Sequence, residues 1–242
     1  MPDDVRAWAA THIGYVRAKN EDRCGTSRWR STGQDETWSG EIDRTCGWAL
    51  IADGMGGHGA GEVASGVALQ ALADLLPGIP DTPGLEPAIE RANERVHAAM
   101  FVPGGRPAMG TTIVGLLMSA RECTFFNVGD SRGYLLRDGR LEMVSRDHVP
   151  EVGGARGGRS HAVTQSLGGT YDRRRLKPHL SSTTLGRGDV VLLCSDGLTD
   201  LVDDGHIAAL LRSGSDRPAT DLVEAALAAG GRDNVSVIVL AF

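Results

Sequence analysis

The sequence lacks the features that would take it out of the class of ordinary globular proteins. No apolar segment approaches the roughly 18 residues that a membrane-spanning helix needs, and no apolar core follows Met1 as in a signal peptide. Linkers, low-complexity runs and internal repeats are absent. We therefore expect a single domain over residues 1–242, located in the cytoplasm and without a membrane partner.

Basic runs and metal-binding cysteine patterns are also absent. The chain has 25 Lys and Arg residues against 31 Asp and Glu, a formal net charge of −6, which argues against a nucleic-acid partner. Its 4 cysteines have no metal-ligand spacing, so they predict reduced packing residues and exclude a thiolate zinc site.

A glycine-rich loop follows a buried apolar run, but it carries no nucleotide-binding fingerprint. GMGGHGAG, residues 54–61, lacks the Lys-Ser/Thr end of a Walker loop, and its glycines are misplaced for G-x-G-x-x-G. Asp53-Gly54 could be a simple turn, as Asp138-Gly139 is. The residues after the loop have helical periodicity, however, so the order is strand, acid, bare loop and helix.

The same pattern, an acidic residue beside an apolar run, recurs along the chain. Asp53, Asp130 and Asp196 end such runs, Asp200 follows a turn later, and Asp233 precedes the last run. Each alone could be a solvated strand end. If they converge, two carboxylates about 4 Å apart repel by about 1 to 4 kcal/mol. A hard divalent cation with oxygen ligands would relieve that repulsion.

Periodicity and turn signals predict the elements that carry these acids. Strands are expected near residues 11–16, 47–53, 111–118, 123–128, 133–137, 141–144, 190–195 and 235–241, and helices near 60–76, 86–100, 206–212 and 217–229. Pro87 and Pro218 suit first turns of helices. The pattern favours an α+β sandwich of two mainly antiparallel β-sheets flanked by pairs of helices.

Eight segments in a fixed order then resemble one known family. They are VRAKNEDR, ADGMGGHGAGEVAS, GTTIVGLL, NVGDSRGYLLRDGRL, the DH pair at 147–148, TQSLGG, LLCSDGLTDLV and GRDNVSVIV. Together they cover nearly the whole chain and resemble the PP2C (PPM) family of metal-dependent protein serine/threonine phosphatases in its bacterial form. The resemblance implies the fold named above and hydrolysis of phosphoserine and phosphothreonine in proteins.

The resemblance also implies a metal centre with Mn²⁺ or Mg²⁺. In it, Asp53 bridges two ions and the Gly54 carbonyl ligates one of them, while Asp196 and Asp233 complete the second ion's protein ligands. Asp130 and Asp200, together with Asp196, are similar to the ligands of a third, weaker ion. A bare loop after Asp53 agrees with this, since no side chain then crowds the ligating backbone.

Three residues of the first segment resemble the family's phosphate and water ligands. Taken alone, Arg17 with Glu21 and Asp22 is a surface charge mixture. By resemblance, Arg17 binds the phosphate, and Glu21 and Asp22 hold waters of the metal ions. A water activated by the ions then attacks phosphorus directly, so no phosphoenzyme is expected.

The chain departs from the family pattern in four places. Met55 stands where animal members carry a His proposed as general acid, and the nearby His58 is expected to be only a solvated loop residue. Gln165 stands where an Arg is expected, and residues 24–46 make a longer first hairpin. The flap at 148–165 is short and glycine-rich, which predicts a mobile loop whose Arg156 and Arg159 contact residues flanking the phosphoamino acid.

These observations predict a monomeric phosphatase of phosphoproteins that opposes a bacterial Hanks-type kinase and acts on that kinase and its targets. Two other functions are weighed against it. A catalytically silent phosphoprotein-binding module would not need Asp53, Asp196 and Asp233 together. A metal phosphodiesterase acting on nucleotides agrees less well with Arg17 and with the order of the segments.

Overall fold

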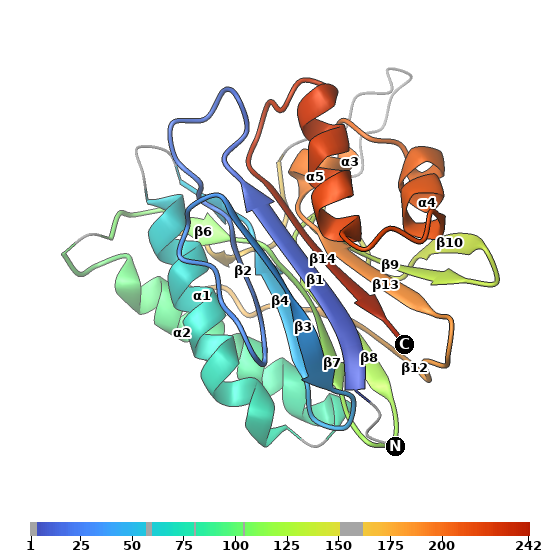
Figure 1. The fold of residues 1–242 in the computed structure, drawn as a ribbon. Coiled ribbons are helices and arrows are strands. Elements are labelled where there is room, and N and C mark those ends of the chain that lie inside the picture. The colour runs from blue at the N-terminus through green and yellow to red at the C-terminus, as the bar shows by residue number, and fades with distance from the viewer. Residues whose placement is uncertain (1–3, 57–59, 80, 104, 151–161) are drawn as a thin grey trace.

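Two antiparallel β-sheets packed face to face, with helices on both outer sides, form the body of the protein (Figure 1). This computed structural model describes residues 4–56, 60–79, 81–103, 105–150 and 162–242. The α+β sandwich expected from the sequence is confirmed. Within the described ranges, no helix has the length and apolar character needed to cross a membrane.

The strands form two large sheets and one small sheet. The six-stranded sheet has the order β10 (Arg140–Met143), β9 (Arg132–Arg137), β13 (Val190–Cys194), β14 (Val235–Ala241), β1 (Asp4–His12) and β3 (Glu36–Asp43). The five-stranded sheet has the order β12 (His179–Thr183), β8 (Cys123–Val128), β7 (Ile113–Met118), β4 (Trp48–Ala52) and β2 (Arg23–Thr26). The small sheet joins β11 (Leu167–Gly168), β6 (Gly110–Thr111) and β5 (Gly54–Met55).

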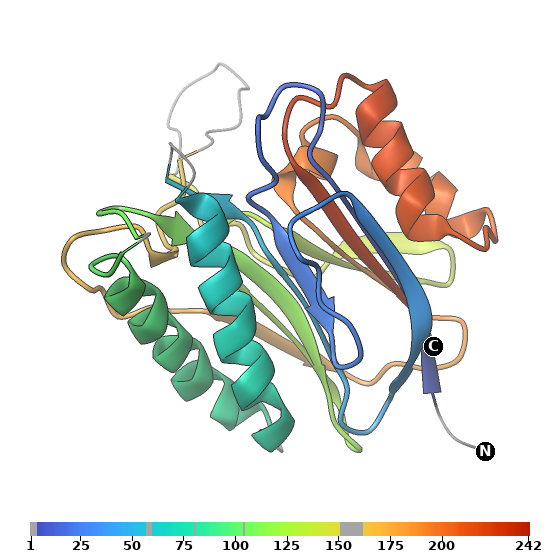
Figure 2. The ribbon, with the colours of Figure 1, turned by 60° about the vertical axis from the view of Figure 1, so that its left-hand side comes forward.

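Helices cover the outer face of each large sheet (Figure 1, Figure 2). The five-stranded sheet carries α1 (Gly61–Leu75) and α2 (Leu85–Ala99), with short 3₁₀ turns at Leu76–Gly78 and Thr82–Gly84. The six-stranded sheet carries α3 (Asp196–Thr199), α4 (Asp204–Arg212) and α5 (Pro218–Ala228). Pro87 and Pro218 lie in the first turns of α2 and α5, as predicted.

Strand β14 shows why the sandwich has three apolar layers. Val237 and Val239 pack under the helices of the six-stranded sheet, whereas Ile238 and Leu240 pack between the two large sheets. Successive side chains of a strand point to opposite faces. A strand with both faces buried therefore needs an almost unbroken apolar sequence, and this is the pattern that made β14 predictable.

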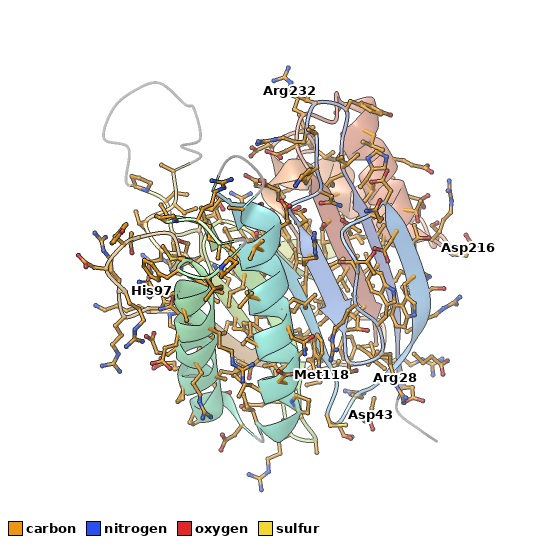
Figure 3. The ribbon with its side chains drawn as sticks, turned by 90° about the vertical axis from the view of Figure 1, so that its left-hand side faces the viewer. Arg28, Asp43, His97, Met118, Asp216 and Arg232 are labelled. Atoms are coloured by element: carbon orange, nitrogen blue, oxygen red, sulfur yellow. The ribbon has the colours of Figure 1, made fainter. Side chains whose placement is uncertain are left out.

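Among the described residues every strand pairing is antiparallel, so the end of one strand lies beside the start of its neighbour. The end of β4 adjoins the start of β2, and the end of β13 adjoins the start of β14. The same end of the sandwich holds Arg232, whereas Met118 and Asp43 lie at the opposite end (Figure 3). Residues that flank these strands are therefore brought to one edge of the molecule.

The predicted first strand at 11–16 is wrong in its boundaries. Strand β1 spans Asp4–His12, where it pairs with β14 on one side and β3 on the other, and a turn follows. Gly14 lies in that turn at φ 81°, and an added Cβ would overlap the carbonyl of Asp233. The turn therefore packs against the residues before β14.

Residues 24–46 do not form the predicted hairpin. Strand β2 pairs with β4 in the five-stranded sheet, whereas β3 pairs with β1 in the six-stranded sheet, so this segment crosses between the layers. Trp29 and Trp38 stack where it crosses, with ring centroids 6.0 Å apart. Neither β12 nor the short α3 was predicted from the sequence, since tertiary pairing and packing define them.

Two glycines should respond in opposite ways to replacement by Ala. Gly115 in β7 lies opposite Phe126 of β8, and a Cβ there would overlap the Phe126 ring. Gly115→Ala should therefore destabilise the fold by about 1–3 kcal/mol through overpacking. Gly66 in α1 has open space around its missing Cβ, so Gly66→Ala should stabilise it by about 0.5–1 kcal/mol. Urea unfolding measures both, and destabilisation by Gly66→Ala would contradict the packing described for α1.

Candidate metal centre

Five carboxylates gather at the edge where the strands of both large sheets begin and end. Asp53, Asp130 and Asp196 follow the ends of β4, β8 and β13, and Asp22 and Asp233 precede β2 and β14. Figure 2 shows the loop after β1, the start of α1 and the loop before β14 meeting at this end. The topology thus joins acids that are up to 211 positions apart, from 22 to 233, in one cluster.

Mutual repulsion identifies Asp53 as the centre of the cluster. Burial raises the pKa of Asp53 well above its ordinary value, and the charges of Asp22, Asp196, Asp233 and Asp130 raise it further. Four like charges thus act on one buried carboxylate. A group in this position either binds a proton or requires a cation beside it.

Asp196, after the end of β13 in the six-stranded sheet, has the same character. Burial raises its pKa to about 7, and the charges of Asp130, Asp200, Asp233 and Asp22 add to the effect. Asp200 is exposed at the end of the first turn after Asp196. Asp130 and Asp200, the predicted third-ion residues, therefore lie near Asp196.

Asp22 is held more rigidly than the others. It is 1 % exposed, and the Ser195 hydroxyl donates a hydrogen bond of 2.9 Å to its carboxylate. Burial raises its pKa to about 6, although hydrogen bonds from Ser236 and Ser195 lower it. Ser236 is a polar residue inside the apolar β14 and Ser195 directly follows the apolar β13, and neither was assigned a role from the sequence.

Glu21 and Gly54 lie against the start of α1. Burial raises the pKa of Glu21, while a hydrogen bond from the Gly61 backbone lowers it. The Ser65 hydroxyl donates to the Glu21 carbonyl at 2.5 Å. A Cβ on Gly54 would collide with the carbonyl oxygens of Gly61 and Glu21, so this backbone can be occupied only by glycine. The bare loop seen in the sequence therefore allows three backbone segments to meet.

Asn234 organises the loop that carries Arg17 and Glu21. Its side-chain amide donates to the carbonyls of Ile13 at 2.8 Å and Lys19 at 2.9 Å. Its side-chain oxygen accepts from the Glu21 backbone N–H at 2.8 Å. Asn234 belongs to the segment GRDNVSVIV, in which the sequence predicted a role only for Asp233. Its own role is to fix the loop against the start of β14.

Arg17 lies at the rim of the cluster. Its guanidinium donates to the Asp233 carboxylate at 2.6 Å, and its side chain is 53 % exposed. That hydrogen bond, with the charges of Asp233, Glu21 and Asp53, raises the pKa of Arg17. A fixed positive charge that is still open to solvent therefore stands beside a group of carboxylates.

Backbone and hydroxyl hydrogen bonds link the Asp53 segment to the Asp130 segment across the five-stranded sheet. The Asp53 carbonyl accepts from the Thr112 N–H at 2.9 Å and from the Thr111 hydroxyl at 2.8 Å. The hydroxyls of Thr112 and Ser131 are 2.7 Å apart, and Ser131 follows Asp130. Both carboxylates are thus attached to one hydrogen-bonded scaffold.

The cluster fits a hard divalent cation by its donor chemistry, since its donors are carboxylate and carbonyl oxygens without thiol or imidazole. In the described ranges, however, no three His, Cys, Asp or Glu side chains form a group that could hold a metal ion as they stand. The carboxylates meet as like charges, and Arg17 is the cation bound directly to one of them.

Five of the residues considered in the sequence are not part of the carboxylate cluster as the structure describes it. His58, Arg156 and Arg159 lie outside the described residues, as does the centre of the flap. Met55 follows Gly54 in β5, and Gln165 is hydrogen-bonded to the backbone of Lys177 in both directions, at 2.8 and 3.3 Å. Gln165 therefore closes a loop rather than facing the carboxylates.

Comparison with known families agrees with this geometry. A family model described as protein phosphatase 2C matches residues 24–229. The chain belongs to the protein phosphatase 2C family.

Known members of the family share both sequence and fold with the chain. Serine/threonine protein phosphatase PstP of Mycobacterium tuberculosis is 34% identical over 254 residues, which cover 97% of this chain and 44% of PstP. A crystal structure of M. tuberculosis PstP/Ppp is similar with a TM-score of 0.80 and 32% identity, covering 98% of this chain and 99% of that one. The catalytic domain of PstP in complex with 2 manganese ions gives a TM-score of 0.77 and 33% identity, covering 98% of each chain. This chain thus spans less than half of full-length PstP.

The repulsion in the cluster predicts how metal-free protein responds to pH. Folding raises the pKa of Asp22 to about 6 and of Asp196 to about 7. Because the folded state then binds protons more tightly than the unfolded state, the cluster's contribution to stability is full below about pH 4 and is lost as pH rises to about 8.

Asp53→Asn isolates this contribution because it removes the central charge. In chelator-treated protein, the melting temperature of Asp53→Asn minus that of the wild type should increase from pH 5 to pH 8 by at least about 2–4 °C, the shift for about 1 kcal/mol in a chain of this size. Thermal unfolding followed by circular dichroism at several pH values measures it. A difference that does not change with pH would contradict the clustering.

Proposed function

We propose that the chain is a metal-dependent protein serine/threonine phosphatase. The observation that carries the proposal is the convergence of Asp53, Asp196 and Asp233 beside the exposed cation of Arg17. Membership of the protein phosphatase 2C family and the likeness to the manganese-bound PstP domain support it. A substrate phosphate is a dianion, so only a site with cations of its own would accept it in a cluster of acids.

Asp53, the Gly54 carbonyl, Asp196 and Asp233 would hold two divalent ions, Mn²⁺ or Mg²⁺. When bound, such ions lower the pKa of a water to near neutrality and offset the charge of a phosphate. Asp22 and Glu21 would orient metal-bound waters; the two serine hydroxyls on Asp22 and the Gly61 N–H on Glu21 fix their direction. Asp130 and Asp200, with Asp196, form the proposed site of a third, weaker ion.

Arg17 would bind the phosphate of the substrate. In the structure its guanidinium is hydrogen-bonded to Asp233, so it would exchange this carboxylate for a phosphate when Asp233 binds a metal ion. A guanidinium forms paired hydrogen bonds with phosphate oxygens and stays charged at all relevant pH values. Asn234 holds the Arg17 loop in place for this contact.

The catalytically silent binding module remains the alternative to be tested. It would need the phosphate contact of Arg17 but not the charge accumulated at Asp53, which destabilises the metal-free fold. We further propose that the chain acts as one domain and one monomer in the cytoplasm, and that its substrates are a Hanks-type kinase and the targets of that kinase.

Removal of a central carboxylate should separate these functions. Asp53→Asn or Asp233→Asn should lower Mn²⁺-dependent hydrolysis of a phosphothreonine peptide by at least about 10²-fold, because each removes a charged metal ligand. Asp74→Asn, at an exposed position of α1, is the matched control and should keep wild-type activity. Phosphate release with Mn²⁺ and with a chelator measures the effect. Turnover by the wild type that is unaffected by the chelator would contradict the proposal.

The third-ion residues should behave differently. Asp130→Ala and Asp200→Ala should keep two tightly bound Mn²⁺ ions, because neither residue belongs to the proposed two-ion set, and should lower turnover. Isothermal titration calorimetry with Mn²⁺ counts the tight sites. Loss of a tight site in either variant would show that the assignment to a weaker ion is wrong.

A further inference from the structure

A cavity opens beside the carboxylate cluster and takes no part in the proposed metal chemistry. Its volume is about 330 Å³, and its lining includes Met55, Ala108, Gln165, Gly168, Arg174 and Arg175. The lining thus brings Met55, which follows Gly54, together with the loop 165–177, which is far away in the sequence.

The three-stranded sheet connects this cavity to Asp53. Met55 pairs with Gly110 and Gly54 with Thr111, while Gly168 and Leu167 pair with the same two residues from the other side. Met55 is two residues from Asp53, or about 7 Å along the strand. An extended peptide advances about 3.3–3.6 Å per residue. A peptide with its phosphoamino acid at the cluster would therefore place a residue about two to four positions away at this cavity.

One face of α2 holds the loop 165–177 in place. Glu90 accepts from the Leu176 N–H at 3.2 Å, Asn93 donates to the Arg174 carbonyl at 3.1 Å, and His97 lies 2.9 Å from the Tyr171 carbonyl. These three residues are three and four positions apart, so they lie on one side of the helix. Figure 3 shows His97 at the end of α2.

Gln165 closes the base of the same loop through its two hydrogen bonds with Lys177. The loop is thus attached at its base and along its length. The wall it contributes to the cavity is built before any ligand arrives, so little ordering entropy is lost when a peptide binds.

The three consecutive arginines of this loop differ in their charge environment. Arg173 is neutralised by Glu90 at 2.6 Å and Glu94 at 3.0 Å. Arg174 and Arg175 line the cavity and are exposed, and within the described part of the chain their guanidinium groups have no ion-pair partner. Two positive charges thus stand at the cavity of a protein whose formal net charge is −6.

We infer that this cavity is a subsite for an acidic side chain of the phosphoprotein, located a few residues from the phosphoamino acid, and that Arg174 and Arg175 determine this preference. The inference rests on the proposed function. A chain with net negative charge repels acidic peptides over most of its surface, so a local pair of cations is what would select them. The inference assigns substrate preference to Arg174 and Arg175 of the loop 165–177, in addition to the contacts predicted for Arg156 and Arg159.

Two phosphothreonine peptides test the subsite, one with Glu at positions two to four from the phosphothreonine and one with Ala there. At low salt the wild type should have a kcat/KM about three- to tenfold higher for the acidic peptide, as expected for exposed charge pairs. Arg174→Ala combined with Arg175→Ala should abolish that ratio and leave p-nitrophenyl phosphate hydrolysis unchanged. The ratio should also shrink at high ionic strength.

Arg173→Ala is the matched control, since it removes one positive charge from the same loop without altering the cavity lining. It should keep the preference for the acidic peptide, and the double Lys variant of Arg174 and Arg175 should keep most of it. Equal kcat/KM of the wild type for both peptides, or an equal loss in the Arg173→Ala variant, would overturn the inference. Loss of p-nitrophenyl phosphate hydrolysis in the double Ala variant would overturn it too.

A binding measurement separates failure of the subsite from failure of the proposed function. If the wild type hydrolyses neither peptide nor p-nitrophenyl phosphate with Mn²⁺ or Mg²⁺, the proposed function fails. Fluorescence anisotropy of the labelled acidic phosphopeptide with chelator-treated protein then reports on the subsite alone. Weaker binding by the double Ala variant, by about threefold or more, supports the subsite, and unchanged binding overturns it.

Discussion

Repulsion among carboxylates at one end of the β-sandwich is the constraint on which the rest of the structure depends. Asp53 and Asp196 are brought together because antiparallel strands from two sheets end and begin at the same edge. Apolar packing of three layers provides the stability that holds them there. Only the binding of protons or cations relieves the repulsion, so the fold creates a site for positive charge before any ligand is considered.

The polar groups around the cluster keep its geometry fixed while the charge changes. Ser195 and Ser236 hold Asp22, Asn234 holds the loop of Arg17, and Gly54 allows the backbones of Glu21 and Gly61 to approach. The same scaffold continues through Thr111 into the three-stranded sheet, and from there to the cavity and its arginines. The proposed cation site and the proposed peptide subsite are thereby parts of one connected framework.

The strands and acidic residues that depend on local sequence pattern were predictable. Strands such as β14, buried on both faces, give unbroken apolar runs, and the acids beside them are visible at once. The sequence pattern did not reveal the crossing of residues 24–46 between sheets, because the pairing of β3 with β1 is set by tertiary contact. Nor did it reveal the role of Asn234 or the anchoring of Gln165, since a hydrogen bond to a distant backbone leaves no periodic signal.

The convergence of Asp53, Asp196 and Asp233 is proposed to form a binding site for divalent cations. Anomalous diffraction from a crystal grown with Mn²⁺ tests it most directly, because the signal locates the metal without reference to activity. Two strong manganese peaks are expected within ligand distance, about 2–2.5 Å, of these carboxylates and the Gly54 carbonyl. Full manganese occupancy elsewhere, with no peak between these carboxylates, would contradict it.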